Sequence, residues 1–175
     1  NGDDPSRPTV PGGEAGLNRV REAIQSGQVK VVSDDFDDKL ASGELIATMA
    51  WSGDTAVLQG ERPDIEFVIP DEGAIQWFDA MVIPKRAANI AAAGRFMNYV
   101  YDPANAARIT AYVGYISPVL GVQDVLRASG DDGVALANSP VLFPDASARN
   151  RLFTWGGLDP ETETRLDDEF LRLVP

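Results

Sequence analysis

The sequence contains two tryptophan–aspartate pairs whose spacing could serve ligand binding. In "GAIQWFDAMVIP", residues 73–84, Trp77 and Asp79 stand two residues apart, so on a strand both side chains project from one face. Upstream, "MAWSGDTAV" contains the second pair, Trp51 and Asp54. A carboxylate inside an otherwise apolar strand needs a cation or several hydrogen-bond donors, because its burial without a partner is costly. The two pairs are therefore candidates for lining one site.

An indole beside a carboxylate suits a flexible organic cation. Aromatic rings cover methylene groups and attract an ammonium, and carboxylates accept its charge-assisted hydrogen bonds. Tyr115, in "YVGYISP", follows a predicted helix end and precedes Ser-Pro, a position where loops often carry function. Structural alternatives stay open: the tryptophans as core residues, Lys85 and Arg86 as partners of Asp79, and Asp54 as a helix N-cap.

The composition excludes several classes of chemistry. Among 175 residues there is no cysteine and no histidine, which removes disulfides, thiolate or histidine metal sites, a cysteine nucleophile and a Ser-His-Asp triad. We expect no catalytic residue, no metal and no cofactor. The net charge of −12 argues against nucleic acid, whose phosphates require a basic surface. An acidic surface mainly gives solubility, and it also concentrates small cations.

The sequence shows no membrane-spanning segment and no leader. No apolar run approaches the roughly 20 residues needed to cross a bilayer. The chain opens at Asn1 without a charged and apolar leader, so we expect that any signal peptide has been removed or was not included.

The order of elements predicts an α/β layered fold. Capping signals predict a helix ending before Gly27, one opened by Asp102-Pro103 and ending near Gly114, and a last one opened by Asp159-Pro160. A further helix should carry Ile90, Met97 and Tyr101. Short helices are expected near residues 34–44 and 54–60, and strands at 28–33, 45–52, 64–70 and 74–84. Alternating strands and helices are typical of layered α/β proteins.

An ordered series of motifs resembles one known family. W-S-G-D, E-G-A-I-Q-W-F-D and G-Y-I-S-P occur in this order, and the similarity extends from about residue 14 to "RLDDEFLRL". The sequence resembles the bacterial spermidine/putrescine-binding proteins, which are solute receptors of polyamine ABC importers. The resemblance implies a two-lobe periplasmic-binding-protein fold of type 2, of which this chain is the C-terminal portion.

The resemblance also implies a division of the chain between two lobes. Residues 1–13 would be a loop or loose end, and residues 14–78 part of the second lobe. Residues 79–116 would be a crossover strand and helices of the first lobe, and residues 117–175 would return to the second lobe and end in a helix.

The resemblance assigns roles to the candidate residues. Trp51 and Trp77 would pack against the polyamine chain, Asp79 would bind an amine, and Tyr115 would close one side of the binding site. Asp54 is typical of putrescine-preferring members, whereas spermidine-preferring members tend to have serine there. The choice of polyamine and the role of Trp155, which falls near another ligand-approaching region, stay open.

The function implied is polyamine capture without catalysis. The receptor would be exported to the periplasm or cell surface, with a lipid anchor as one means of retention, and would deliver its ligand to the permease subunits of an ABC transporter after closure of the lobes. Alternatives from the residues alone are a receptor for another cationic or sugar-like solute, a structural domain, and a hydrolase using Asp54 and Asp79 as a carboxylate pair.

A partial receptor should also expose apolar surface. Residues 87–113 are expected to form helices that lack cover, with Ile90, Met97, Ile109 and Val113 exposed. We therefore predict self-association, or a retained upstream fragment that supplies the missing strands.

Overall fold

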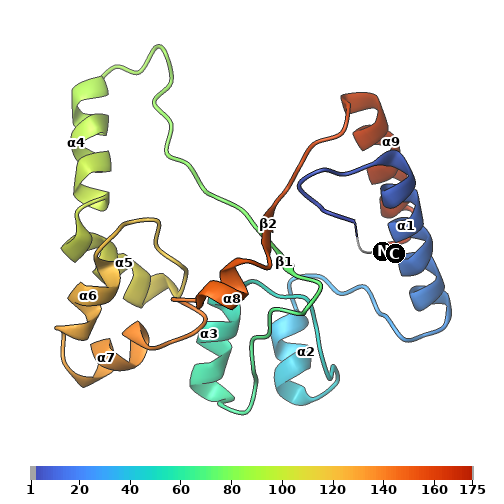
Figure 1. The fold of residues 1–175 in the computed structure, drawn as a ribbon, viewed down its shortest axis with the longest axis horizontal. Coiled ribbons are helices and arrows are strands. Elements are labelled where there is room, and N and C mark those ends of the chain that lie inside the picture. The colour runs from blue at the N-terminus through green and yellow to red at the C-terminus, as the bar shows by residue number, and fades with distance from the viewer. Residues whose placement is uncertain (1–2, 175) are drawn as a thin grey trace. The chain divides into compact units, whose positions relative to one another are not determined.

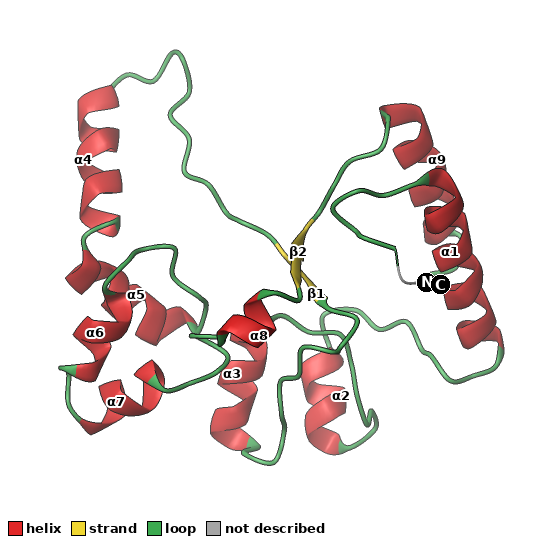
Figure 2. Ribbon diagram, viewed as in Figure 1, coloured by secondary structure: helices red, strands yellow, loops and turns green. Residues whose placement is uncertain are grey.

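The computed structural model describes residues 3–174, and within them helices and loops predominate over a small sheet (Figure 2). These residues divide into two compact units. The first holds the described residues up to Phe36, Ile69–Trp77 and the described residues from Asn150 onward, and the second holds Asp37–Val68 and Phe78–Arg149. None of the helices within residues 3–174 has the length and apolar character needed to cross a bilayer.

The first unit is built on two long helices, the first and last of the chain, which pack side by side (Figure 1). Helix α1 (Val10–Gln25) has Thr9 as its N-cap, and the hydroxyl of Thr9 accepts a hydrogen bond from Gly12 N at 3.1 Å. Helix α9 (Pro160–Leu171) has Asp159 as its N-cap, and the carboxylate of Asp159 accepts a hydrogen bond from Thr162 N at 3.0 Å. The predicted start of α9 is confirmed, whereas α1 begins before residue 14, because Thr9 and a first-turn proline already supply its start signal.

The sheet of the first unit has two short parallel strands. Strand β1 (Ala74–Gln76) pairs with β2 (Leu152–Thr154) in the register Ala74↔Leu152, Ile75↔Phe153 and Gln76↔Thr154. The ladder is extended at its start by Ala74 N donating to Arg151 O at 2.9 Å, and Arg151 pairs with Asp71 at 2.8 Å. Together with the helices, this parallel pair gives the chain the α/β character predicted from its sequence.

Most of the predicted strands do not form a ladder. Residues 28–33, 45–52 and 64–70 contain no strand, and the strand predicted at 74–84 ends at Gln76. Those four predictions were wrong in whole or in part. A segment rich in branched and aromatic residues suits a pleated surface, but its backbone forms a strand only where a second segment supplies hydrogen bonds. Among residues 3–174, only residues 74–76 and 152–154 find such a partner.

The second unit has its core in three consecutive helices. Helices α5 (Pro103–Val113), α6 (Val122–Arg127) and α7 (Asp131–Ala137) pack together through small and branched side chains. The buried set is Ala106, Ala107, Val122, Leu126 and Ala137. A side-chain bond joins two of these helices, because Gln123 Nε2 donates to the carbonyl of Ala137 at 2.8 Å.

Both ends of α5 lie where the sequence predicts them. Asp102 caps the N-terminus by accepting from Ala104 N at 3.0 Å and from Asn105 N at 3.2 Å, and Pro103 occupies the first turn. Gly114 closes the C-terminus with φ 72°, in the left-handed region. The second unit also contains most of α2 (Phe36–Ser42), and all of α3 (Ser52–Glu61), α4 (Ile90–Val100) and α8 (Ala146–Arg149).

Helices α4 and α5 expose apolar side chains, as expected from their sequence. On α4, Ile90, Phe96 and Tyr99 are exposed, whereas Met97 is half-buried. On α5, Ile109 and Val113 are exposed. The surface needed for self-association is therefore present, and self-association itself stays a prediction.

Candidate functional site

Asp54 lies in the first turn of α3, a helix of the second unit. The residue at the N-cap is Trp51, whose carbonyl accepts from Thr55 N at 3.2 Å and from Thr55 Oγ1 at 3.2 Å. The hypothesis that Asp54 is the N-cap is wrong, because the helix begins two residues earlier, at Ser52. A carboxylate in the first turn is still favoured by the positive end of the helix dipole.

Tyr115 packs against this first turn of α3. Its ring lies over the buried backbone of Gly53, and its own backbone follows the left-handed residue Gly114. The side chain is half-buried. Tyr115, which follows the end of α5, therefore contacts Gly53, the residue directly before Asp54.

Electrostatics connect Tyr115 to both predicted carboxylates. Burial raises the pKa of Tyr115 above the ordinary value of 10.0, and the negative charges of Asp54 and Asp79 raise it further. The hydroxyl therefore stays protonated at neutral pH and can both donate and accept a hydrogen bond. Asp54, Asp79 and Tyr115 all belong to the second unit, so their proximity is a property of one compact body.

Trp77 and Asp79 follow strand β1 rather than lying on it. The strand ends at Gln76, so alternation along a strand does not place their side chains on one face, and that prediction is corrected. Both residues are exposed, and 50% of the surface of Trp77 is accessible. Such exposure contradicts the alternative in which Trp77 is a core residue.

Trp51 has the same degree of exposure as Trp77, 50%, so it too is not a core residue. The structure therefore brings Asp54, Asp79 and Tyr115 near one another in the second unit, and about half of the surface of each tryptophan is exposed. That the two tryptophans contact the same ligand stays a prediction.

Trp155 directly follows strand β2, as Trp77 directly follows strand β1. Trp77 follows Gln76 and Trp155 follows Thr154, and these two strand residues are partners in the parallel register. Trp77 and Trp155 therefore each directly follow the last paired residue of their strand, at the carboxyl ends of the two parallel strands. Trp155 is 74% exposed. Sequence reasoning left the role of Trp155 open, because the register between two strands far apart in the chain is not visible in the sequence.

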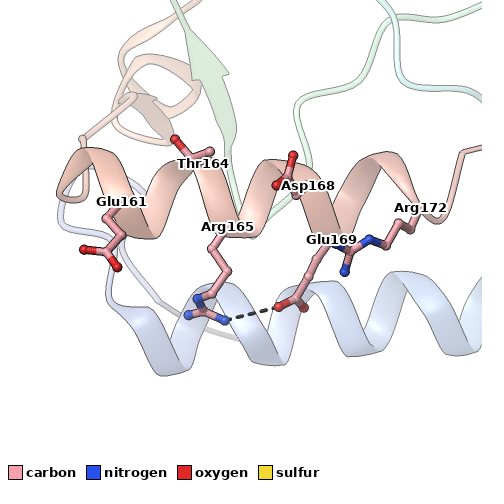
Figure 3. A pocket seen from close by; sticks show the side chains of 6 residues that line it. All are labelled: Glu161, Thr164, Arg165, Asp168, Glu169 and Arg172. Atoms are coloured by element: carbon pink, nitrogen blue, oxygen red, sulfur yellow. Dashed lines mark hydrogen bonds and ion pairs between the residues drawn. The ribbon is translucent and has the colours of Figure 1, made fainter.

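A depression on the surface of α9 is lined by none of these residues. It has a volume of about 340 Å³ and is lined by Glu161, Thr164, Arg165, Asp168, Glu169 and Arg172 (Figure 3). Arg165 pairs with Glu169 at 3.2 Å on the same helix and with Glu14 of α1 at 3.0 Å. The Arg165–Glu14 pair joins α9 to α1, so the surface around Arg165 serves the packing of the two helices.

Known proteins match the chain over most of its length. Residues 1–138 match the sequence model of a family described as bacterial extracellular solute-binding protein. The chain is 31% identical over 133 residues to the spermidine/putrescine-binding periplasmic protein of Escherichia coli, which is 76% of this chain and 36% of that protein. It is 27% identical to a putrescine-binding periplasmic protein of the same bacterium, over 75% of this chain and 35% of the relative.

A more distant relative comes from another bacterium. The chain is 24% identical over 147 residues to a putrescine-binding periplasmic protein of Pseudomonas aeruginosa, which is 81% of this chain and 38% of that protein. The chain thus spans roughly a third of the length of the curated relatives it matches.

Proposed function

Because the chain belongs to the bacterial extracellular solute-binding proteins, we propose that it is part of a receptor that captures polyamines, putrescine or spermidine, outside the cytoplasm. The family is one of solute-binding proteins rather than enzymes. The observation that carries the proposal is the packing of Tyr115 on the first turn of α3, which carries Asp54, within the unit that also contains Asp79. Relatives named for binding spermidine and putrescine support the choice of an amine.

Each residue has a distinct role in this proposal. Asp54 and Asp79 accept charge-assisted hydrogen bonds from the ammonium groups of the ligand, and the neutral hydroxyl of Tyr115 supplies a further polar contact. The half-exposed side chains of Trp51 and Trp77 cover the methylene chain and attract its cationic ends. The complete receptor, in the periplasm or at the cell surface, then delivers the ligand to the permease of an ABC transporter.

Calorimetry on the intact protein with putrescine, spermidine and a neutral sugar tests the proposal. A diamine or triamine should bind with a Kd of about 1 μM or lower, corresponding to roughly 8 kcal/mol. Binding should weaken as salt rises, because charges on the surface are screened. Binding of the sugar alone would favour a different solute class, and absence of any amine binding would refute the proposal.

The carboxylate-pair hydrolase is the competing class of function. A hydrolase using Asp54 and Asp79 would release product from chromogenic glycosides, and this release would disappear in the Asp79→Asn variant. We expect no turnover of such substrates, together with saturable binding of amines. Catalytic release that depends on Asp79 would assign the site to the other class.

A further inference from the structure

We propose that Gly53 and Gly114 are positioning residues, which together fix the ring of Tyr115 against the first turn of α3 and so determine where its hydroxyl stands. The inference rests on the proposed function for its effect on amine binding. Its structural part concerns the contact between the two glycines and the tyrosine, and that part can be tested without a ligand.

Gly53 provides the surface on which the ring lies. A Cβ atom at this position would stand closer than 3.0 Å to the Cε2, Cδ2 and Cζ atoms of Tyr115, a separation that real Cβ atoms essentially do not reach. Gly53 is buried in the first turn of α3. Glycine inside a helix is unfavourable relative to alanine, so its presence here points to a requirement for space rather than for helix formation.

Gly114 brings the tyrosine to that surface. It has φ 72°, a backbone conformation in which a side chain is strained. A Cβ atom would also approach the Cβ of Ala56 at 3.2 Å and the carbonyl oxygen of Gly53 at 3.4 Å. The end of α5 therefore lies directly against the start of α3, and the next residue after Gly114 is Tyr115.

Ring packing is what holds Tyr115 in place. Among the hydrogen bonds of residues 3–174, none involves the Tyr115 hydroxyl, so the side chain is oriented by its contact with Gly53 and by the turn at Gly114. A hydroxyl held in this way remains available to a ligand. An added methyl group at Gly53 must move the ring, and with it the hydroxyl, while leaving Asp54 and Asp79 chemically intact.

The first test measures the ring position by fluorine NMR in protein labelled with 3-fluorotyrosine. The chain has four tyrosines, and the Tyr115→Phe variant identifies the Tyr115 signal. In Gly53→Ala this signal should shift, and its titration should move to lower pH, because the displaced hydroxyl leaves the buried position near two negative charges. The matched control is Gly60→Ala on the same helix, where a Cβ meets nothing within 4 Å. An unchanged Tyr115 signal in folded Gly53→Ala would overturn the proposal.

A second pair of variants covers the case in which Gly53→Ala does not fold. Removing the ring with Tyr115→Ala should create room for the methyl group. We therefore expect Gly53→Ala to lower the urea midpoint in the wild-type background and to have little effect in the Tyr115→Ala background. An equal loss in both backgrounds would show that Gly53 acts independently of Tyr115 and would overturn the proposal.

Calorimetry with putrescine then tests the effect on binding. Gly53→Ala should weaken putrescine binding by about tenfold or more, the loss expected when a hydrogen bond to a charged ligand is misplaced. Gly60→Ala should bind like the wild type. If the wild type binds no amine, the proposed function fails while the NMR result still decides whether Gly53 positions the ring of Tyr115. If the ring moves and putrescine affinity is unchanged, the binding part of the inference is wrong.

Discussion

Replacing Asp79 by Asn in the intact protein should weaken putrescine binding by about 1.5–3 kcal/mol, the scale of one hydrogen bond to a charged group. This corresponds to a roughly 10- to 150-fold rise in Kd. Asp79 is exposed and the substitution preserves its shape, so the folded state should lose little stability. The effect should therefore fall on affinity, and loss of the Asp79 charge should also lower the pKa of Tyr115.

Isothermal titration calorimetry at two salt concentrations gives both the magnitude and its origin. The difference between wild type and Asp79→Asn should shrink at high salt, because a charge near the surface is screened. Asp168→Asn is the matched control, since Asp168 is an exposed aspartate on α9 in the first unit. Unchanged putrescine affinity in Asp79→Asn, or an equal loss in the control, would remove Asp79 from the binding site.

Four further predictions concern the helices and aromatic residues. Asp102→Ala removes the acceptor for two backbone N–H groups at the start of α5 and should lower the free energy of unfolding in urea by about 1 kcal/mol; no change would show that the cap is dispensable. The pKa of Tyr115 is raised on folding, so the stability this group contributes is complete below pH 10.0 and is lost as pH rises through the higher folded value. Tyr115→Phe should therefore flatten the fall in unfolding free energy above pH 10.0, and an identical pH profile would contradict the direction of the shift. Trp155→Ala should weaken putrescine binding by roughly 1 kcal/mol if its ring continues the surface of Trp77, and calorimetry that finds no change would exclude Trp155. Light scattering on the 175-residue chain should show concentration-dependent association that Phe96→Glu reduces and Val57→Glu on α3 does not, whereas a stable monomer that melts cooperatively would refute exposed α4 as an association surface.

Both ends of α5 and the start of α9 could be predicted because their signals are local. Asp102, Pro103 and Gly114 lie within or beside α5, and the structure uses each of them as expected. Asp159 and Pro160 open α9 for the same reason. Capping depends on a side chain and on backbone groups two or three residues away, so a single sequence contains the necessary information.

The strands could not be predicted with equal success, because a strand depends on its partner. The ion pair beside the sheet, Arg151 with Asp71, joins residues that are 80 positions apart in the sequence. Nothing in the apolar pattern of residues 64–70 or 74–84 indicates which segment will pair with which. Hydrophobic alternation predicts a surface that suits a sheet, and only tertiary structure supplies the second strand.

The candidate site was also predicted only in part. The identities of Asp54, Asp79 and Tyr115 were predicted from residue types and from the resemblance, and the structure places all three in one unit. The contact of Tyr115 with Gly53 was not predicted, because it depends on the close approach of α3 and the end of α5. The glycine within W-S-G-D was a signal that could have indicated a close backbone contact.

The pairing of the first and last helices has a consequence for the order in which the chain folds during synthesis. Arg165 on α9 and Glu14 on α1 are 151 positions apart, so the first unit cannot close until α9 has been synthesised. The contacts among α5, α6 and α7 are local and can form much earlier. Closure of the first unit is therefore the later step, and the core formed by α5, α6 and α7 can already be in place when α9 is synthesised.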